Sequence, residues 1–303
     1  MDIRVVFMGS PDFALPTLRA LHQKFNVIGV VTQPDRPAGR GQRLQPPDVK
    51  LLAESLNLSV IQPKSLKEPV ALQQLEEWHP DVIVVAAFGQ ILRENVLTLP
   101  RFGCVNVHAS LLPRWRGAAP VQAALLNDDT TGVTIMKMDA GLDTGPILSQ
   151  GALQIPPDST AGDLFSILAK MGADLLIDTL PDYVQGQIQP QPQDEEQATY
   201  APRLAKSDGE LDFNLPAAIL ARKVRAYNPW PGTFSHFEGT RIKIYRAHAS
   251  ERNQVRPGKR YVIDGQPAWG TSQGILVLDE VQLAGKGRLS GLEFLRGAKN
   301  WIE

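Results

Sequence analysis

The sequence predicts an α/β protein in which an open, mostly parallel sheet is followed by a small β-rich domain. Short apolar runs alternate with segments of helical periodicity over residues 1–180. Residues 82–87 read Val-Ile-Val-Val-Ala-Ala, which is apolar on both faces, as in a central parallel strand. Beyond residue 208, short alternating segments flanked by Gly or Pro replace this pattern. Together these observations predict a Rossmann-like sheet with helices on both sides, and then a small β-barrel.

In the first part of the chain, strands and helices are expected to alternate. Residues 3–8 form an apolar run that stops at Gly9-Ser10-Pro11, and Asp12 is a candidate N-cap for the helix that follows. Strands are expected at 3–8, 27–31, 82–87, 105–108, 133–138 and 147–155, and helices at 12–24, 49–56, 70–78, 118–126 and 160–180.

A break in composition divides the chain. Residues 186–199 are rich in Gln and Pro, have little to bury, and are expected to form an extended linker. We therefore predict a first domain over 1–188, a linker over 189–207 and a second domain over 208–303. The second domain is expected to open with a helix at 217–226 and to continue with strands that include 240–245, 260–263 and 274–278.

The composition excludes several classes of protein. With 303 residues, 31 Lys+Arg, 32 Asp+Glu and 43% hydrophobic residues, the chain can bury a core and is not a disordered chain. A single cysteine, Cys104, excludes a disulfide framework or a Cys-rich zinc module, and we expect it to be buried as a small apolar residue. No run reaches the roughly 18 apolar residues of a membrane span, and the N-terminus lacks a signal-peptide pattern. We expect a cytoplasmic protein with no membrane partner.

The balanced net charge hides a basic segment. Residues 222–260 contain ten Lys and Arg residues against two Glu residues. Such a segment favours a polyanionic partner, because each neutralised phosphate releases counterions. A solvated surface with acidic residues nearby in space is the alternative, and charge alone does not decide between them.

Several common chemistries have no support. Gly9-Ser10-Pro11 lacks the Gly-x-Gly-x-x-Gly pattern of a dinucleotide site, and there is no Walker loop, Gly-x-Ser-x-Gly elbow or His-Glu-x-x-His motif. The five histidines are scattered, so we expect no metal site.

One strand end carries residues suited to catalysis. Asn106 and His108 are two apart on a strand, so their side chains share a face near its carboxyl end, where open α/β sheets bind ligands. Asn can donate to an oxyanion and His can move a proton near neutral pH. Asp139 and Asp143 lie in a Gly-rich loop downstream, from which a carboxylate could orient the imidazole. A structural His and turn-forming Asp residues remain the alternative. The combination indicates acyl or one-carbon transfer without a covalent nucleophile.

These residues carry a resemblance to a known family. Residues 106–117 (Asn-Val-His-Ala-Ser-Leu-Leu-Pro-Arg-Trp-Arg-Gly) with Gly-Leu-Asp-Thr-Gly at 141–145 resemble the folate-dependent formyltransferases. The likeness runs nearly end to end, and it includes the motifs at 7–14, 32–41, 225–231 and 284–286. The basic loop and the C-terminal motifs are similar to those of the members that act on tRNA in translation initiation.

The resemblance implies a reaction and its catalytic residues. A formyl group would pass from 10-formyltetrahydrofolate to the α-amine of methionyl-initiator-tRNA. The catalytic residues of the family fall on Asn106, His108 and Asp143. Asn106 would stabilise the oxyanion, His108 would handle protons, and Asp143 would hold and polarise His108.

The resemblance also implies binding residues, a second-domain fold and a monomeric state. The second domain would be an OB-like barrel that binds tRNA. Loop 33–46 would contact the acceptor end, although a solvated connection is its alternative interpretation. Phe88 could equally belong to the core. The implied folate-binding residues are Phe88, Ile91, Leu92, Ser110, Leu111, Leu112, Pro113 and Asp139, and the implied tRNA-binding residues are Arg36, Arg40, Arg43, Lys206, Arg222 and Arg225.

Three rival functions can be weighed. A formyltransferase acting on a sugar-nucleotide amine could share the sheet and the catalytic residues, but such a substrate needs no long basic arm. A purine-pathway formyltransferase would leave residues 208–303 unexplained. A tRNA-binding module without catalysis would not be expected to retain all three catalytic residues.

Overall fold

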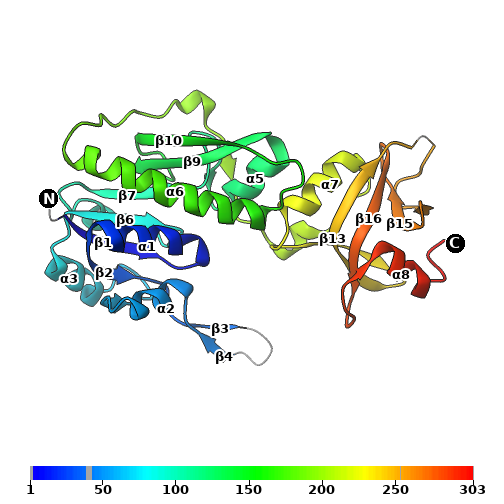
Figure 1. Ribbon diagram of the computed structural model, residues 1–303, viewed down its shortest axis with the longest axis horizontal. Coiled ribbons are helices and arrows are strands. Elements are labelled where there is room, and N and C mark those ends of the chain that lie inside the picture. The colour runs from blue at the N-terminus through cyan, green and yellow to red at the C-terminus, as the bar shows by residue number, and fades with distance from the viewer. Residues whose placement is uncertain (1–2, 39–42, 253, 303) are drawn as a thin grey trace. The chain divides into compact units, whose positions relative to one another are not determined.

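The computed structural model describes residues 3–38, 43–252 and 254–302, and the chain folds into two compact units (Figure 1). The first unit contains Met1–Pro120, Thr130–Leu153 and Phe165–Ala201. The second contains Val121–Asp129, Gln154–Leu164 and Pro202–Glu303. The predicted linker, residues 189–207, is thus shared between the two units.

The first unit is built on a seven-stranded sheet. The strand order is β10-β9-β7-β6-β1-β2-β5. Neighbours from β7 to β5 run parallel, whereas β9 pairs antiparallel with β7, so the sheet is mixed but mostly parallel. This confirms the predicted fold class. The strands are β1 (Arg4–Gly9), β2 (Asn26–Val31), β5 (Val60–Ile61), β6 (Val82–Ala86), β7 (Cys104–His108), β9 (Thr130–Lys137) and β10 (Ile147–Gln154).

The predicted helices of residues 1–188 begin and end within a few residues of their expected ranges, whereas the short helix at 94–97 was not predicted. At the first of them, Asp12 is not the N-cap, because Pro11 occupies that position and Asp12 accepts a hydrogen bond from the backbone N–H of Phe13. A 3₁₀ turn over Asp12–Ala14 then leads into the helix. The helices are α1 (Leu15–Lys24), α2 (Asp48–Ser55), α3 (Pro69–Trp78), α4 (Glu94–Leu97), α5 (Pro120–Asn127) and α6 (Ala161–Val184).

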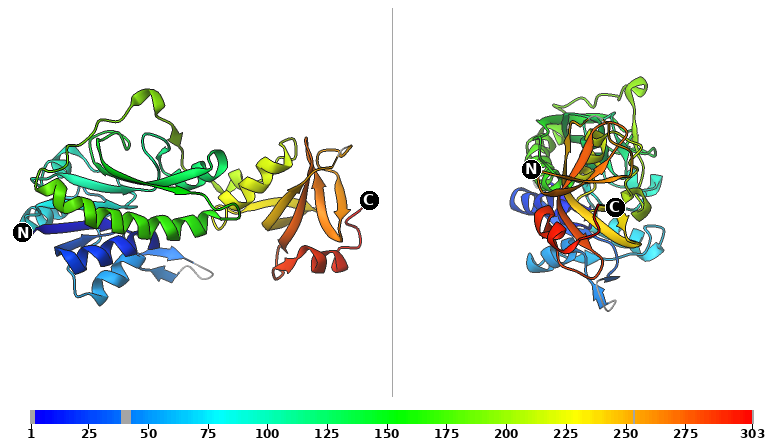
Figure 2. Two further views of the ribbon diagram at one scale, coloured as in Figure 1. Left: turned by 45° about the horizontal axis from the view of Figure 1, so that its top comes forward. Right: turned by 90° about the vertical axis from the view of Figure 1, so that its right-hand side faces the viewer.

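Helix α6 lies along one face of the sheet in both views (Figures 1 and 2). The helix approaches β7 closely at Gly172, where a methyl group would stand 2.6 Å from Cγ1 of Val107. Val107 therefore points towards α6, and its neighbours Asn106 and His108 point to the opposite face, because side chains alternate along a strand. The helix thus packs against the face of β7 opposite to Asn106 and His108.

Some short elements have no counterpart in the sequence-based expectations. Residues 33–46, expected to be a loop, contain a hairpin of β3 (Arg36–Ala38) and β4 (Arg43–Gln45). A second small pair joins β8 (Arg116–Gly117) to β11 (Tyr200–Ala201), which lies inside the predicted linker. Segments of two or three residues carry too little periodicity to be predicted from sequence.

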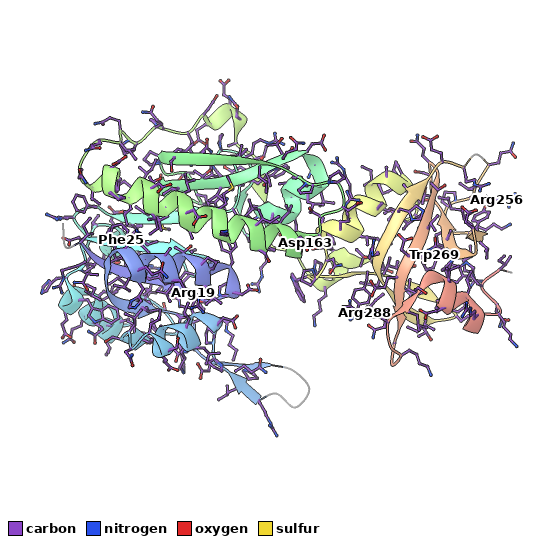
Figure 3. The ribbon with its side chains drawn as sticks, viewed as in Figure 1. Arg19, Phe25, Asp163, Arg256, Trp269 and Arg288 are labelled. Atoms are coloured by element: carbon purple, nitrogen blue, oxygen red, sulfur yellow. The ribbon has the colours of Figure 1, made fainter. Side chains whose placement is uncertain are left out.

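The second unit is rich in antiparallel strands, as predicted. Helix α7 (Ala217–Ala226) precedes a sheet with the order β12-β13-β16-β15-β14, and β17 pairs with β16. In its core, Trp269 (Figure 3) stacks on Phe213 and meets Trp301 edge to face, and the ring centroids are 4.9 Å apart in both pairs. The strands and the last helix are β12 (Thr233–Phe237), β13 (Thr240–Ser250), β14 (Arg260–Ile263), β15 (Gln266–Gly270), β16 (Ile275–Leu283), β17 (Leu289–Ser290) and α8 (Gly291–Gly297).

Candidate active site

Strand β7 carries two polar side chains in a largely apolar sheet. Asn106 is 9% exposed and His108 is 6% exposed. Among the residues that the structure describes, none hydrogen-bonds the side chain of Asn106. Its amide can therefore donate to a bound ligand, which a carbonyl oxygen that develops negative charge requires.

His108 is held between two acceptors. Its Nε2 lies 3.1 Å from the backbone oxygen of Trp115, and its Nδ1 lies 3.8 Å from Oδ2 of Asp143. The second distance is too long for a hydrogen bond, and the contact is an ion pair only when the imidazole is protonated. Such catalytic contacts are often long without substrate and shorten in the reacting complex. The two oxygens fix the plane of the imidazole ring.

Asp143 reaches His108 from a loop rather than from a strand. Its backbone has φ of 54°, in the left-handed region that non-Gly residues rarely adopt. Oδ2 accepts a hydrogen bond of 2.9 Å from the backbone N–H of Gly117, and Nε2 of Gln193 donates to the backbone oxygen of Asp143 at 2.8 Å. His108 and Asp143 therefore lie close together, and Asn106 shares a face of β7 with His108. The catalytic roles of all three stay a prediction.

The segment after β7 is tied to β9 by a small polar network. The hydroxyl of Thr134 donates to the backbone oxygen of Ser110 and accepts from the backbone N–H of Leu112. Gln150 donates to the backbone oxygen of Leu112 at 2.7 Å and to Thr134 at 2.9 Å. Leu112 is buried, whereas Leu111 and Pro113 are partly exposed. These hydrogen bonds fix the backbone that follows β7 against β9 and β10.

The remaining predicted folate-binding residues lie in two loops. Phe88 and Leu92 are buried in the apolar core, whereas Ile91 between them is 87% exposed. Asp139 uses Oδ1 to accept from the hydroxyl of Thr144 at 2.6 Å, so it shapes the loop that carries Asp143. Leu142 in this loop is also exposed. Exposed apolar side chains such as Ile91 and Leu142 can contact the face of an aromatic ligand.

A pocket of about 410 Å³ adjoins the first of these loops. Three basic side chains, Lys64, Lys67 and Arg93, line it together with Ile91. Its chemistry suits an anionic group attached to an apolar one.

The predicted tRNA contacts in the first unit lie on the β3–β4 hairpin. Arg36 and Arg43 are exposed there, and Arg36 donates to the side chain of Gln33 at 2.9 Å. Arg40 lies outside the described residues. An exposed hairpin can present guanidinium groups to phosphates better than a buried loop can.

The predicted contacts in the second unit differ in exposure. Lys206 is exposed at the start of a 3₁₀ turn, Lys206–Gly209. Arg222 is paired with Asp129 at 2.5 Å and has a third of its side chain exposed. Arg225 is partly buried, burial lowers its pKa, and its Nε has no hydrogen-bond partner among the described residues. Lys206 is therefore more exposed to solvent than Arg222 or Arg225.

Burial explains the state of the one cysteine. Cys104 is fully buried, and this desolvation raises the pKa of its thiol to about 12. It therefore takes no part in nucleophilic chemistry near neutral pH, in line with the expectation of a small apolar residue.

Two side chains that position the Asp143 loop are not predicted from the sequence. Gln193 donates to the backbone of Asp143 from a Gln- and Pro-rich stretch, and Arg116 donates in turn to Gln193. No local sequence pattern reveals these contacts, because they join residues 50 and 77 positions apart in the chain.

Within the described ranges, no group of three His, Cys, Asp or Glu side chains could hold a metal ion. No helix among the residues searched is long and apolar enough to cross a membrane.

Comparisons with known proteins show the family to which the chain belongs. A family model described as formyl transferase matches residues 3–180, and a second, for the formyl transferase C-terminal domain, matches residues 203–299. The chain belongs to the formyl transferase family.

Two relatives and one solved structure refine the likeness. The methionyl-tRNA formyltransferase of Chloroflexus aurantiacus is 45% identical over 97% of this chain and 97% of its own. That of Herpetosiphon aurantiacus is 44% identical over 98% and 99%. The solved structure of WlaRD, a sugar 3N-formyl transferase in the presence of dTDP and 5-N-formyl-THF, has a TM-score of 0.67 at 18% identity, over 95% of this chain and 100% of that one. At that identity, the last comparison shows the shared fold alone.

Proposed function

We propose that this chain transfers a formyl group from 10-formyltetrahydrofolate to the α-amine of methionyl-initiator-tRNA, for use in translation initiation. The identity of 44–45% to methionyl-tRNA formyltransferases over nearly the whole of both chains supports this acceptor. The approach of His108 to Asp143 next to Asn106 is the structural observation that carries the chemistry. A cytoplasmic location and a monomeric state stay predictions.

The residues present fit a folate that carries a formyl group. The exposed side chain of Ile91 offers an apolar surface, and hydrogen bonds to Thr134 hold the backbone of 110–112 in place after β7. Lys64, Lys67 and Arg93 suit the carboxylates of a folate tail. When bound, this co-substrate supplies the formyl group.

The three catalytic side chains divide the work of the transfer. The amine nitrogen of methionine forms a bond to the formyl carbon, whose bond to the folate nitrogen then breaks. Asn106 donates a hydrogen bond to the formyl oxygen as it gains negative charge. His108 takes the proton released by the amine and delivers it to the leaving nitrogen, and Asp143 stabilises the charged imidazole between these steps. Holding both substrates together supplies much of the rate through positioning.

A sugar-nucleotide amine is the weaker candidate acceptor. Its support is a shared fold at 18% identity. The exposed Arg36 and Arg43 on the β3–β4 hairpin favour a substrate with many phosphates.

The proposal is tested by offering both acceptors to the purified protein. Formyl transfer from 10-formyltetrahydrofolate is measured with charged initiator tRNA and with a dTDP-linked amino sugar, at several salt concentrations. We expect transfer to the tRNA alone, falling as salt rises. Transfer to the sugar alone, insensitive to salt, would keep the catalytic residues and discard the tRNA acceptor.

A further inference from the structure

The chain after α6 crosses both loops that form the candidate active site. We call residues 191–201 the strap (Figure 1, the yellow-green segment). At its start, Gln191 exchanges two backbone hydrogen bonds of 2.8 Å with Ile147, which follows the Asp143 loop. At its end, the hydroxyl of Thr199 accepts from the backbone N–H of Trp115, and β11 pairs with β8. The strap therefore joins the 113–119 loop to the 139–147 loop.

Gln193 is the residue of the strap that contacts both loops through its side chain. Its Nε2 donates to the backbone oxygens of Asp143 at 2.8 Å and of Gly145 at 2.7 Å. Its Oε1 accepts from Nε and Nη2 of Arg116, at 3.0 and 2.8 Å. All four hydrogen-bonding positions of the amide are thus filled. A flipped amide would place its NH₂ against a guanidinium and its oxygen against two carbonyls, so only one orientation fits.

Arg116 fixes Gln193 in turn. The side chain of Arg116 has no exposed surface, and its Nη1 and Nη2 donate to the two carboxylate oxygens of Glu195 at 2.9 and 2.8 Å. These two hydrogen bonds to Glu195 raise the pKa of Arg116 and lower that of Glu195. A buried guanidinium with a bidentate partner is a rigid anchor, because its donors lie in one plane.

These contacts bear directly on the catalytic carboxylate. Asp143 adopts a positive φ, a strained conformation that persists only when its surroundings enforce it. Its backbone oxygen is held by Gln193, and its Oδ2 is held by the N–H of Gly117, the residue next to Arg116. One network thus sets both the backbone and the side chain of Asp143.

We propose that Gln193 is a positioning residue for formyl transfer, holding the Asp143 loop against Arg116 so that the carboxylate faces His108. This inference rests on the proposed catalytic role of Asp143. Gln193 touches neither reacting atom in this arrangement and acts through Asp143. A displacement of about 1 Å in a catalytic group can lower the rate by about 100-fold.

The test compares two variants at position 193. Gln193→Ala removes all four hydrogen bonds, and Gln193→Glu keeps an acceptor for Arg116 but cannot donate to the loop carbonyls. We expect kcat to fall by about 10- to 100-fold in both, with KM for each substrate within about threefold of wild type. The pH dependence of kcat should also move, because the geometry of His108 and Asp143 changes. Gln191→Ala is the matched control, because its side chain donates only to the nearby backbone oxygen of Gln189, and it should keep the wild-type kcat.

A double-mutant cycle with Asp143→Asn separates positioning from a general loss of stability. If Gln193 acts through Asp143, adding Gln193→Ala to Asp143→Asn should lower kcat by less than about twofold further. An equal loss in both backgrounds, or a wild-type kcat in Gln193→Ala beside a lost kcat in Asp143→Asn, would overturn this inference alone. A wild-type kcat in Asp143→Asn would overturn the proposed catalytic role and this inference with it.

Discussion

At the scale of single residues, the charge of Asp143 should matter more than its shape. Asp143→Asn keeps an oxygen that can accept from the N–H of Gly117 but removes the negative charge beside His108. Because the charged imidazole then loses its partner, we expect kcat to fall by about 10²- to 10⁴-fold. Steady-state formylation kinetics check this.

Binding assays supply the control for that prediction. The affinity for tRNA should stay within about threefold of wild type, since Asp143 is not among the predicted phosphate contacts. His22→Ala, an exposed histidine on α1, should leave both quantities unchanged. A loss of tRNA affinity in Asp143→Asn would contradict the division between catalytic and tRNA-binding residues.

A second residue-scale prediction concerns Cys104. With its pKa raised to about 12 by burial, the thiol should resist alkylation by iodoacetamide at pH 8 in the folded protein and react once denatured. The raised pKa of Cys104 also determines whether the free energy of unfolding rises or falls with pH. The folded state keeps its proton where the unfolded thiol, with a pKa near 8.5, has lost it. The free energy of unfolding should therefore fall as pH rises from about 9 towards 12, and less so in Cys104→Ala.

At the scale of elements, helix α6 packs closely against β7 and β9 at Gly172. A Cβ at Gly172 would stand 2.6 Å from Cγ1 of Val107 and 3.3 Å from Cγ1 of Val133. Both valines are fully or almost fully buried strand residues and cannot move aside cheaply. Although Ala favours helix by about 1 kcal/mol over Gly, we expect Gly172→Ala to lower the free energy of unfolding by about 1–3 kcal/mol.

Urea unfolding checks this prediction. Gly297→Ala, at the end of α8 with no atom within 4 Å of the added methyl, is the control and should be close to neutral. An unchanged midpoint in Gly172→Ala would show that α6 can shift from the sheet at little cost.

The elements also show what could be predicted from the sequence. The long helices and the run at 82–87 have strong periodicity or continuous apolar character, and the structure confirms them. The placement of Asn106 and His108 on one face of the strand follows from the period of two along a strand. The positions of Gln193 and Arg116 could not be predicted, because hydrogen bonds between residues 77 apart leave no local pattern.

The antiparallel direction of β9 could not be predicted from the sequence either. Its sequence, Thr130–Lys137, is apolar enough for a buried strand, but apolar character does not fix direction. Direction is set by which neighbour it pairs with, and His108 faces Thr134 across that pairing. The same pairing brings the hydroxyl of Thr134 to the backbone of Ser110.

At the scale of the whole molecule, both units contain basic residues that are predicted to bind tRNA. Arg36 and Arg43 lie on the first unit, and Lys206 and the segment 222–260 belong to the second. The predicted folate contacts, in contrast, all lie in the first unit. Salt should therefore act on the two substrates differently, since counterion release scales with the number of phosphates contacted.

Salt-dependent kinetics test this difference. We expect KM for charged tRNA to rise steeply with salt, while KM for 10-formyltetrahydrofolate changes little. Arg43→Ala should raise KM for tRNA and reduce the slope of log KM against log salt by about 1, the contribution of one phosphate contact. Arg19→Ala on the exposed surface of α1 (Figure 3) serves as the control of equal charge, and its slope should match that of wild type. Equal slopes for both variants would mean that net charge, rather than a contact made by the β3–β4 hairpin, governs tRNA binding.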